Sequence, residues 1–216
     1  MTDGRVERGN QTRRLVLDRT MKIASVEGLE GLSLGKLATE LGLSKSGVFA
    51  LFGSKEDLQL ATVRAAVEVF VDRVVRPLRE EAPGALRVWR LCELWLEYSD
   101  RRVFPGGCFF YSVAAEFDAR PGPVHDEIAK ARRDWLAAVE RQVDLARQAG
   151  SLREDTDAGQ LAFEIIALME LANAESVLHD DAAVYRRAAT GILNRLRAAA
   201  TAPDELPVRP PSFGAV

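Results

Sequence analysis

Apolar residues recur every three or four positions along most of the 216-residue chain, whereas no segment alternates strongly enough to predict a β-strand. The period is interrupted between residues 33 and 58, where Gly42 separates two short amphipathic pieces and Gly53 ends the second. Ser33 and Ser44 stand where the N-terminal caps of these pieces belong. The pattern therefore predicts an all-helical protein with a helix-turn-helix near its N-terminus.

The second short piece has a face suited to the major groove of DNA. Its expected apolar stripe comprises Val48, Phe49 and Phe52, and its expected outward face comprises Lys45, Ser46, Gly47 and Ala50. Small side chains let a helix backbone approach base edges, and a lysine donates hydrogen bonds to guanine or to phosphate. The same spacing also occurs in ordinary pairs of core helices, so the motif taken alone leaves both interpretations open.

A further helix is predicted to begin directly after this motif. Ser54 is followed three residues later by Asp57, which is a capping signature, and the free N–H groups of the new helix together with Lys55 suit a phosphate. Apolar periodicity continues to about Arg76, and Pro77 should end or kink the helix. Such a long helix belongs both to the N-terminal domain and to the following body, so we expect it to transmit movement between them. A rigid spacer is the alternative.

The same stretch resembles the DNA-binding domain of TetR-family transcriptional regulators. The residues that carry the likeness are Ala38, Gly42, Leu43, Ser44, Gly47, Phe49, Phe52, Ser54, Lys55 and Leu58. The resemblance is close over residues 12–60 and is limited to length and helical pattern beyond them. Members usually carry Tyr where Phe49 stands and often His where Leu51 stands, so this chain lacks two polar groups expected at phosphate.

The motif and the resemblance together predict the residues that contact DNA: Ser33, Ser44, Lys45, Ser46, Gly47, Phe49 and Lys55. The distribution of charge along the chain agrees with DNA contact by the N-terminal segment. The net charge is -3, but residues 1–55 hold nine Lys or Arg against six Asp or Glu, which gives +3, and residues 56–216 hold 20 against 26, which gives -6. A basic N-terminal segment on an acidic body fits a protein that binds DNA.

Composition divides the chain into four segments. We expect a disordered N-terminal arm at residues 1–11, the helix-turn-helix domain at 12–55, a helical ligand-binding and dimerisation domain at 56–200, and a disordered Pro-rich tail at 201–216. In the arm, Arg5 and Arg8 are candidates for loose phosphate contacts. The helices predicted outside the motif lie at residues 12–27, 84–100, 108–117, 124–150, 157–179 and 182–200.

Eight of the fifteen aromatic residues lie between positions 89 and 117. Such a cluster is ordinarily core, but four large or apolar residues in a row from Cys108 to Tyr111 exceed what one helix face buries. We therefore predict a pocket for a small apolar or aromatic effector, with a few polar contacts. Its candidate residues are Trp95, Tyr98, Phe109, Phe110, Tyr111, Glu116, Trp135 and Met169. The break at residues 104–107 is either a plain turn or a hinge.

The last two predicted helices carry more apolar surface than one neighbour requires. This surplus predicts a four-helix interface with a second copy, and intramolecular core is the alternative. The candidate interface residues are Ile165, Leu168, Leu171, Val184, Ala188, Ile192 and Leu196. The TetR resemblance implies the same homodimer, whose two recognition helices would lie about one DNA turn, or a small multiple, apart.

Signals for other classes are weak. Neither His125 nor His179 belongs to a nucleophile motif or has zinc-ligand spacing, so we predict no catalytic residue, metal or cofactor. The N-terminus lacks the apolar core of a signal peptide and no run of about 18 apolar residues exists, which indicates a cytoplasmic protein without membrane contact.

The sequence thus predicts a homodimeric regulator, a repressor released from a near-palindromic operator by its effector. One alternative is a helical carrier or enzyme with a structural N-terminal domain. The other is a regulator controlled by protein partners or by the thiols of Cys92 and Cys108, which do not make a disulfide framework.

Overall fold

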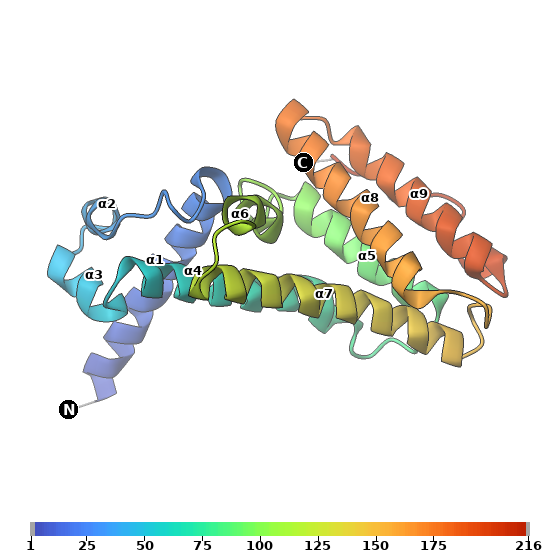
Figure 1. The fold of residues 1–216 in the computed structure, drawn as a ribbon, viewed down its shortest axis with the longest axis horizontal. Helices are drawn as coiled ribbons and strands as arrows, with labels where there is room; N and C mark the ends of the chain where they lie inside the picture. Colours follow the sequence, from blue (N-terminus) through green and yellow to red (C-terminus); the bar gives the residue numbers. More distant parts are fainter. Residues whose placement is uncertain (1–2, 215–216) are drawn as a thin grey trace. The chain divides into compact units, whose positions relative to one another are not determined.

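The computed structural model describes residues 3–214, with side chains from residue 7 onward, and over this range the chain forms nine α-helices and no β-strand (Figure 1). The helices are α1 (Asp3–Glu27), α2 (Leu34–Glu40), α3 (Lys45–Phe52), α4 (Lys55–Phe70), α5 (Ala85–Asp100), α6 (Phe109–Phe117), α7 (Pro123–Gln148), α8 (Ala158–His179) and α9 (Ala183–Ala199). The all-helical prediction is confirmed. The chain forms two compact units: residues 1–69 with 104–131, called here the head unit, and residues 70–103 with 132–216, called the body unit.

The helix-turn-helix forms where the caps and glycines predict it. The Ser33 hydroxyl accepts a hydrogen bond from the Lys36 N–H at 3.4 Å, and the Ser44 hydroxyl accepts one from the Gly47 N–H at 3.0 Å. Gly42 follows α2 with φ +64°. A left-handed backbone of this kind strongly favours glycine, so the residue type fixes where the turn begins.

The long helix predicted from Lys55 to Arg76 is only partly α-helical. The α-helix ends at Phe70, and a π-helical turn (Val71–Val75) and a 3-10 turn (Arg76–Leu78) follow. Pro77 has no N–H to donate, and its ring excludes the carbonyl four residues earlier. The regular α-helical hydrogen bonds therefore cannot continue to Arg76. The hydrogen-bond pattern changes before Pro77, in the π-helical turn that follows Phe70.

The predicted N-terminal arm is helical instead of disordered. Helix α1 begins at Asp3, nine residues before its predicted start, and the Thr12 hydroxyl donates to the Arg8 carbonyl at 2.9 Å within it. The segment holds no proline to interrupt the first helix, so α1 extends through it. Residues 1–2 and the side chain of Arg5 lie outside the described part of the chain.

In the body unit, α5, α8 and α9 pack along one another (Figure 1). Buried polar side chains from these helices form a cluster with Arg102. The Ser99 hydroxyl donates to the Asn173 side-chain oxygen at 2.8 Å and lies 2.8 Å from the Tyr185 hydroxyl. Arg102 donates to the same Tyr185 hydroxyl at 2.8 Å. Buried polar groups must be satisfied, so this network specifies how the three helices align.

The tail predicted to be disordered is ordered as far as Gly214. Leu206 is buried, the Phe213 ring lies 6.0 Å from the Tyr185 ring, and the Gly214 N–H donates to the Asp100 carboxylate at 3.0 Å. The prolines indicated disorder by composition, but two apolar side chains among them supply enough contact to hold the segment on the body unit.

Candidate nucleic-acid interface

The outward face of α3 carries three of the residues predicted to meet DNA. Lys45, Ser46 and Gly47 are exposed at its first turn, while Val48 and Phe52 are buried below it. Small and basic side chains therefore lie on the side of a capped two-turn helix that is free to enter a groove.

Phe49 departs from the predicted apolar stripe. Its side chain is 56% exposed, whereas Val48 and Phe52 are 0% and 6% exposed. These two residues are four apart and centre the stripe, and Phe49 lies one 100° step away from Val48. The aromatic ring is consequently on the flank of the outward face, where it is available to a sugar–phosphate chain.

Lys55 is already engaged within the head unit. Its ammonium donates to the Glu30 carbonyl at 2.7 Å and pairs with the Glu30 carboxylate at 2.9 Å. Hydrogen bonds from Lys55 and then Gln59 hold the pKa of Glu30 below its usual value. The residue predicted as part of a phosphate site thus ties the start of α4 to the loop after α1.

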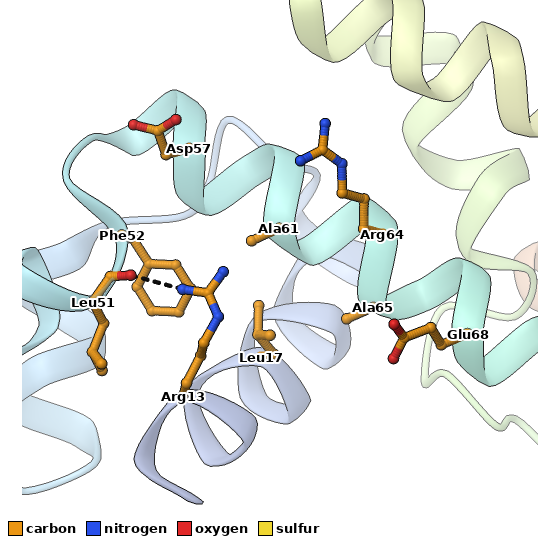
Figure 2. A pocket seen from close by; sticks show the side chains of 9 residues that line it. All are labelled: Arg13, Leu17, Leu51, Phe52, Asp57, Ala61, Arg64, Ala65 and Glu68. Carbon is orange, nitrogen blue, oxygen red and sulfur yellow. Dashed lines mark hydrogen bonds between the residues drawn. The ribbon is translucent and has the colours of Figure 1, made fainter. Parts of the chain in front are cut away.

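Arg13 holds the end of the recognition helix. Its guanidinium donates to the Leu51 carbonyl at 2.7 Å and lies 4.5 Å from the centre of the Phe52 ring (Figure 2). The Leu51 carbonyl is among the last four of α3, which have no partner inside the helix. Arg13 also lines a hollow of about 370 Å³ whose walls come from α1, α3 and α4. Arg13 therefore positions α3 on α1.

Glu116, a predicted effector contact, instead binds the loop that follows α1. Its two carboxylate oxygens accept from the backbone N–H groups of Leu29 at 2.7 Å and Glu30 at 2.8 Å. Gly28 has φ +78°, and a Cβ there would stand 2.7 Å from the same carboxylate. Glycine at position 28 therefore allows both the left-handed turn and the close approach of the Glu116 carboxylate.

The break at residues 104–107 is a tight turn pressed against α1. The Gly107 N–H donates to the Phe104 carbonyl at 2.9 Å, and the Gly106 N–H donates to the Ser25 hydroxyl at 3.2 Å. A Cβ on Gly106 would stand 1.8 Å from the Ser25 carbonyl oxygen, so only glycine fits. The geometry is that of the plain-turn interpretation.

The predicted effector residues fall into two sets. Phe109, Phe110, Tyr111 and Glu116 belong to the head unit, and Trp95, Tyr98, Trp135 and Met169 belong to the body unit. In the body unit, Phe70 meets Tyr98 and Trp135 edge to face at 5.5 Å and 5.0 Å between ring centres. The aromatic rings there are packed against one another, as in a core.

Comparison with known proteins agrees with this architecture. Residues 16–62 match the family described as bacterial regulatory proteins, tetR family, and residues 84–192 match the tetracyclin repressor-like, C-terminal domain. The second match alone covers half of the chain. The chain belongs to the TetR family. It is a DNA-binding transcriptional regulator with an N-terminal helix-turn-helix domain.

Individual relatives show how far the likeness extends. An uncharacterized HTH-type transcriptional regulator, YezE of Bacillus subtilis, is 34% identical over 73 residues, which are 34% of this chain and 37% of that protein. A TetR regulator from Chloroflexus aurantiacus is 25% identical, with a TM-score of 0.80 over 86% of this chain and 94% of that one. AibR, solved with isovaleryl coenzyme A and operator DNA, is 17% identical, with a TM-score of 0.66 over 83% of this chain and 95% of that one, and shares the fold.

In this TetR-family chain, four residues predicted for the dimer interface lie inside the protomer. Ile165, Ala188, Ile192 and Leu196 are each at most 5% exposed. They form the contact between α8 and α9, so the alternative of intramolecular core holds for them. Leu171, from the same predicted set, is 60% exposed. Leu168 and Val184 are half-buried.

The surplus apolar surface lies on a neighbouring face of α8. Its exposed members Phe163, Leu171 and Leu178 are 64%, 60% and 74% exposed and stand at intervals of eight and seven residues, so they follow one side of the helix. We call this set the α8 stripe. An apolar face of this kind is typical of a contact with another molecule.

Cys92 is not suited to a thiol switch. Its side chain is fully buried, and burial raises the pKa of the thiol to about 12. The reactive thiolate is therefore scarce at neutral pH.

None of the described helices is long and apolar enough to cross a membrane.

Proposed function

We propose that this TetR-family regulator is a homodimeric repressor that leaves a near-palindromic operator when a small apolar or aromatic effector binds its helical body. The proposal is supported mainly by the exposed face of α3, a capped helix on which Lys45, Ser46 and Gly47 point outward. One such helix per protomer supplies one operator half-site, and two-fold symmetry supplies the second.

The α8 stripe supports the dimer. Phe163, Leu171 and Leu178 leave a row of large apolar side chains in water in the single chain. A second copy related by a two-fold axis presents the identical row, so one surface is complementary to itself. The proposed interface therefore uses the α8 stripe and Leu171 in particular.

The effector proposal rests on the aromatic cluster of the body unit and on AibR, whose structure contains both isovaleryl coenzyme A and operator DNA. Trp95, Tyr98 and Met169 are closely packed and nearly inaccessible. An effector must therefore separate these side chains to enter, and we propose that the separation changes the tilt of α4. A coupling of about 1 to 3 kcal/mol would lower operator affinity roughly 5- to 150-fold.

Replacing Lys45 tests the recognition helix directly. We expect Lys45→Ala to weaken binding to DNA from upstream of the gene, because the variant loses a donor to guanine or phosphate, worth about 1 to 3 kcal/mol if the contact is to a base. Fluorescence anisotropy at fixed salt concentration measures the change. Lys22→Ala is the matched control, because it removes a lysine whose partner is Asp18 on the same helix. Equal affinities for the two variants would show that α3 does not read the operator.

A regulator controlled by a protein partner is the second candidate, favoured by the closed packing of Phe70 with Tyr98 and Trp135. Control by a protein partner predicts operator release without a change in tryptophan fluorescence. Entry of an effector beside Trp95 and Trp135 predicts that tryptophan fluorescence changes when the operator is released.

A further inference from the structure

A second groove lies between the start of α1 and the start of α3. Its volume is about 270 Å³, and it is lined by Arg8, Gly9, Thr12, Leu43, Ser44, Gly47 and Leu51. Ser44 and Gly47 begin the recognition helix, so the groove continues the face that meets DNA. Arg8, Gly9 and Thr12 precede residue 16, where the match to the tetR-family model begins. The groove is thus built partly from an extension of α1 beyond the matched domain.

Gly9 is unexplained by packing within the chain. It lies inside α1, where glycine destabilises a helix relative to alanine. A Cβ at this position would meet no atom within 4 Å, so alanine would fit. Close approach of another molecule is a physical reason for leaving this wall of the groove bare.

The composition of the groove fits a sugar–phosphate chain. Arg8 is exposed at one wall and supplies a guanidinium, which binds phosphate with two parallel hydrogen bonds. Leu43 and Leu51 supply apolar surface of the kind that packs against deoxyribose. Residues 3–14 hold four arginines, one aspartate and one glutamate, so their net charge of +2 attracts an anionic polymer.

We propose that this groove holds the backbone of one operator strand beside the major-groove site, with Arg8 bound to a phosphate. The proposal rests on the DNA binding proposed above and adds a contact that positions the protein without reading sequence. It accounts for the groove beside α3, for Gly9 and for the helical extension of α1 together.

Salt dependence tests the phosphate contact. For a dimer on two half-sites, Arg8→Ala removes two phosphate contacts, so the slope of log affinity against log salt should fall in magnitude by about 2. Binding to operator and to scrambled DNA should weaken by the same factor. Arg101→Ala removes an exposed arginine from the body unit and should leave the slope unchanged. An Arg8→Ala slope equal to that of the wild type would overturn the proposal.

Filling the groove is an independent test. Gly9→Leu should keep the helical circular dichroism of the wild type and lose operator affinity, because its side chain occupies the site of the backbone. Gln11→Leu places the same side chain on the exposed surface of α1, outside the groove, and should bind normally. Equal affinities for these two variants would contradict a strand in the groove.

Neutral methylphosphonates, introduced singly into the operator, locate the contact. The wild type should lose affinity at one flanking position per half-site, and Arg8→Ala should lose nothing further there. If each methylphosphonate weakened binding by Arg8→Ala as much as it weakens binding by the wild type, including at that flanking position, the proposed contact would be overturned. If the wild type prefers no DNA sequence at all, the proposed function fails as well, and this result differs from a failure confined to the variants.

Discussion

Arg13 and Glu116 fix the helix-turn-helix by binding backbone groups that its helices leave without partners. Arg13 satisfies a carbonyl at the end of α3, and Glu116 satisfies two N–H groups after α1. Neither role was predictable from sequence, because Arg13 and Leu51 are 38 residues apart and Glu116 and Leu29 are 87 apart. The Ser33 and Ser44 caps were predictable, because each bonds a group three residues away.

The Glu116 contact predicts a loss of stability. Glu116→Ala leaves the buried Leu29 N–H without its acceptor, which costs about 1 to 3 kcal/mol. Urea unfolding followed by circular dichroism measures the change in free energy of unfolding. Asp118→Ala removes an exposed carboxylate at the end of the same helix and serves as control. A Glu116→Ala midpoint equal to that of the control would contradict the contact.

The local sequence pattern determines some helix boundaries and leaves others undetermined. Boundaries with a cap or a glycine, as at α2 and α3, agree with the sequence because the deciding hydrogen bonds span one turn. The helical start of α1 and the ordered tail were missed. In the tail, the deciding contacts are Phe213 with Tyr185 and Gly214 with Asp100, which come from distant parts of the chain. On α8, Ile165 from the predicted interface set is buried within the protomer, whereas Leu171 from the same set is exposed. A helix with apolar residues on most sides gives no periodic signal for which side its own neighbours bury.

The α8 stripe predicts that one charge will separate the protomers. Leu171→Glu should convert the proposed dimer to monomer, because each protomer would lose apolar burial worth about 1.5 kcal/mol or more and would gain a carboxylate in an apolar contact. The monomer core should be intact, since this side chain is exposed in the single chain. Sedimentation velocity measures the oligomeric state.

Val208→Glu is the matched control, because Val208 is 86% exposed in the tail. Retention of the dimer by Leu171→Glu would place the interface on another surface. Loss of the dimer in both variants would indicate an effect of net charge.

The protein joins a basic helix-turn-helix segment to an acidic helical body, and both parts match the TetR family. The class of the protein could be predicted from the sequence because the helix-turn-helix is a local motif. The residue patterns also predict an interface and an effector site. Several residues of the predicted interface are buried within one protomer, because a local pattern does not show which surfaces distant segments of the chain cover.

Operator recognition is tested most directly by the binding of wild-type protein to DNA from upstream of its own gene. Fluorescence anisotropy measures this binding against scrambled DNA over a range of salt concentrations. We expect tight binding that prefers the upstream sequence, saturates at one dimer or two per site, and weakens steeply with salt. Weak binding that is equal on scrambled DNA would contradict an operator at this location. Saturation at a single protomer would contradict the two-fold arrangement of recognition helices.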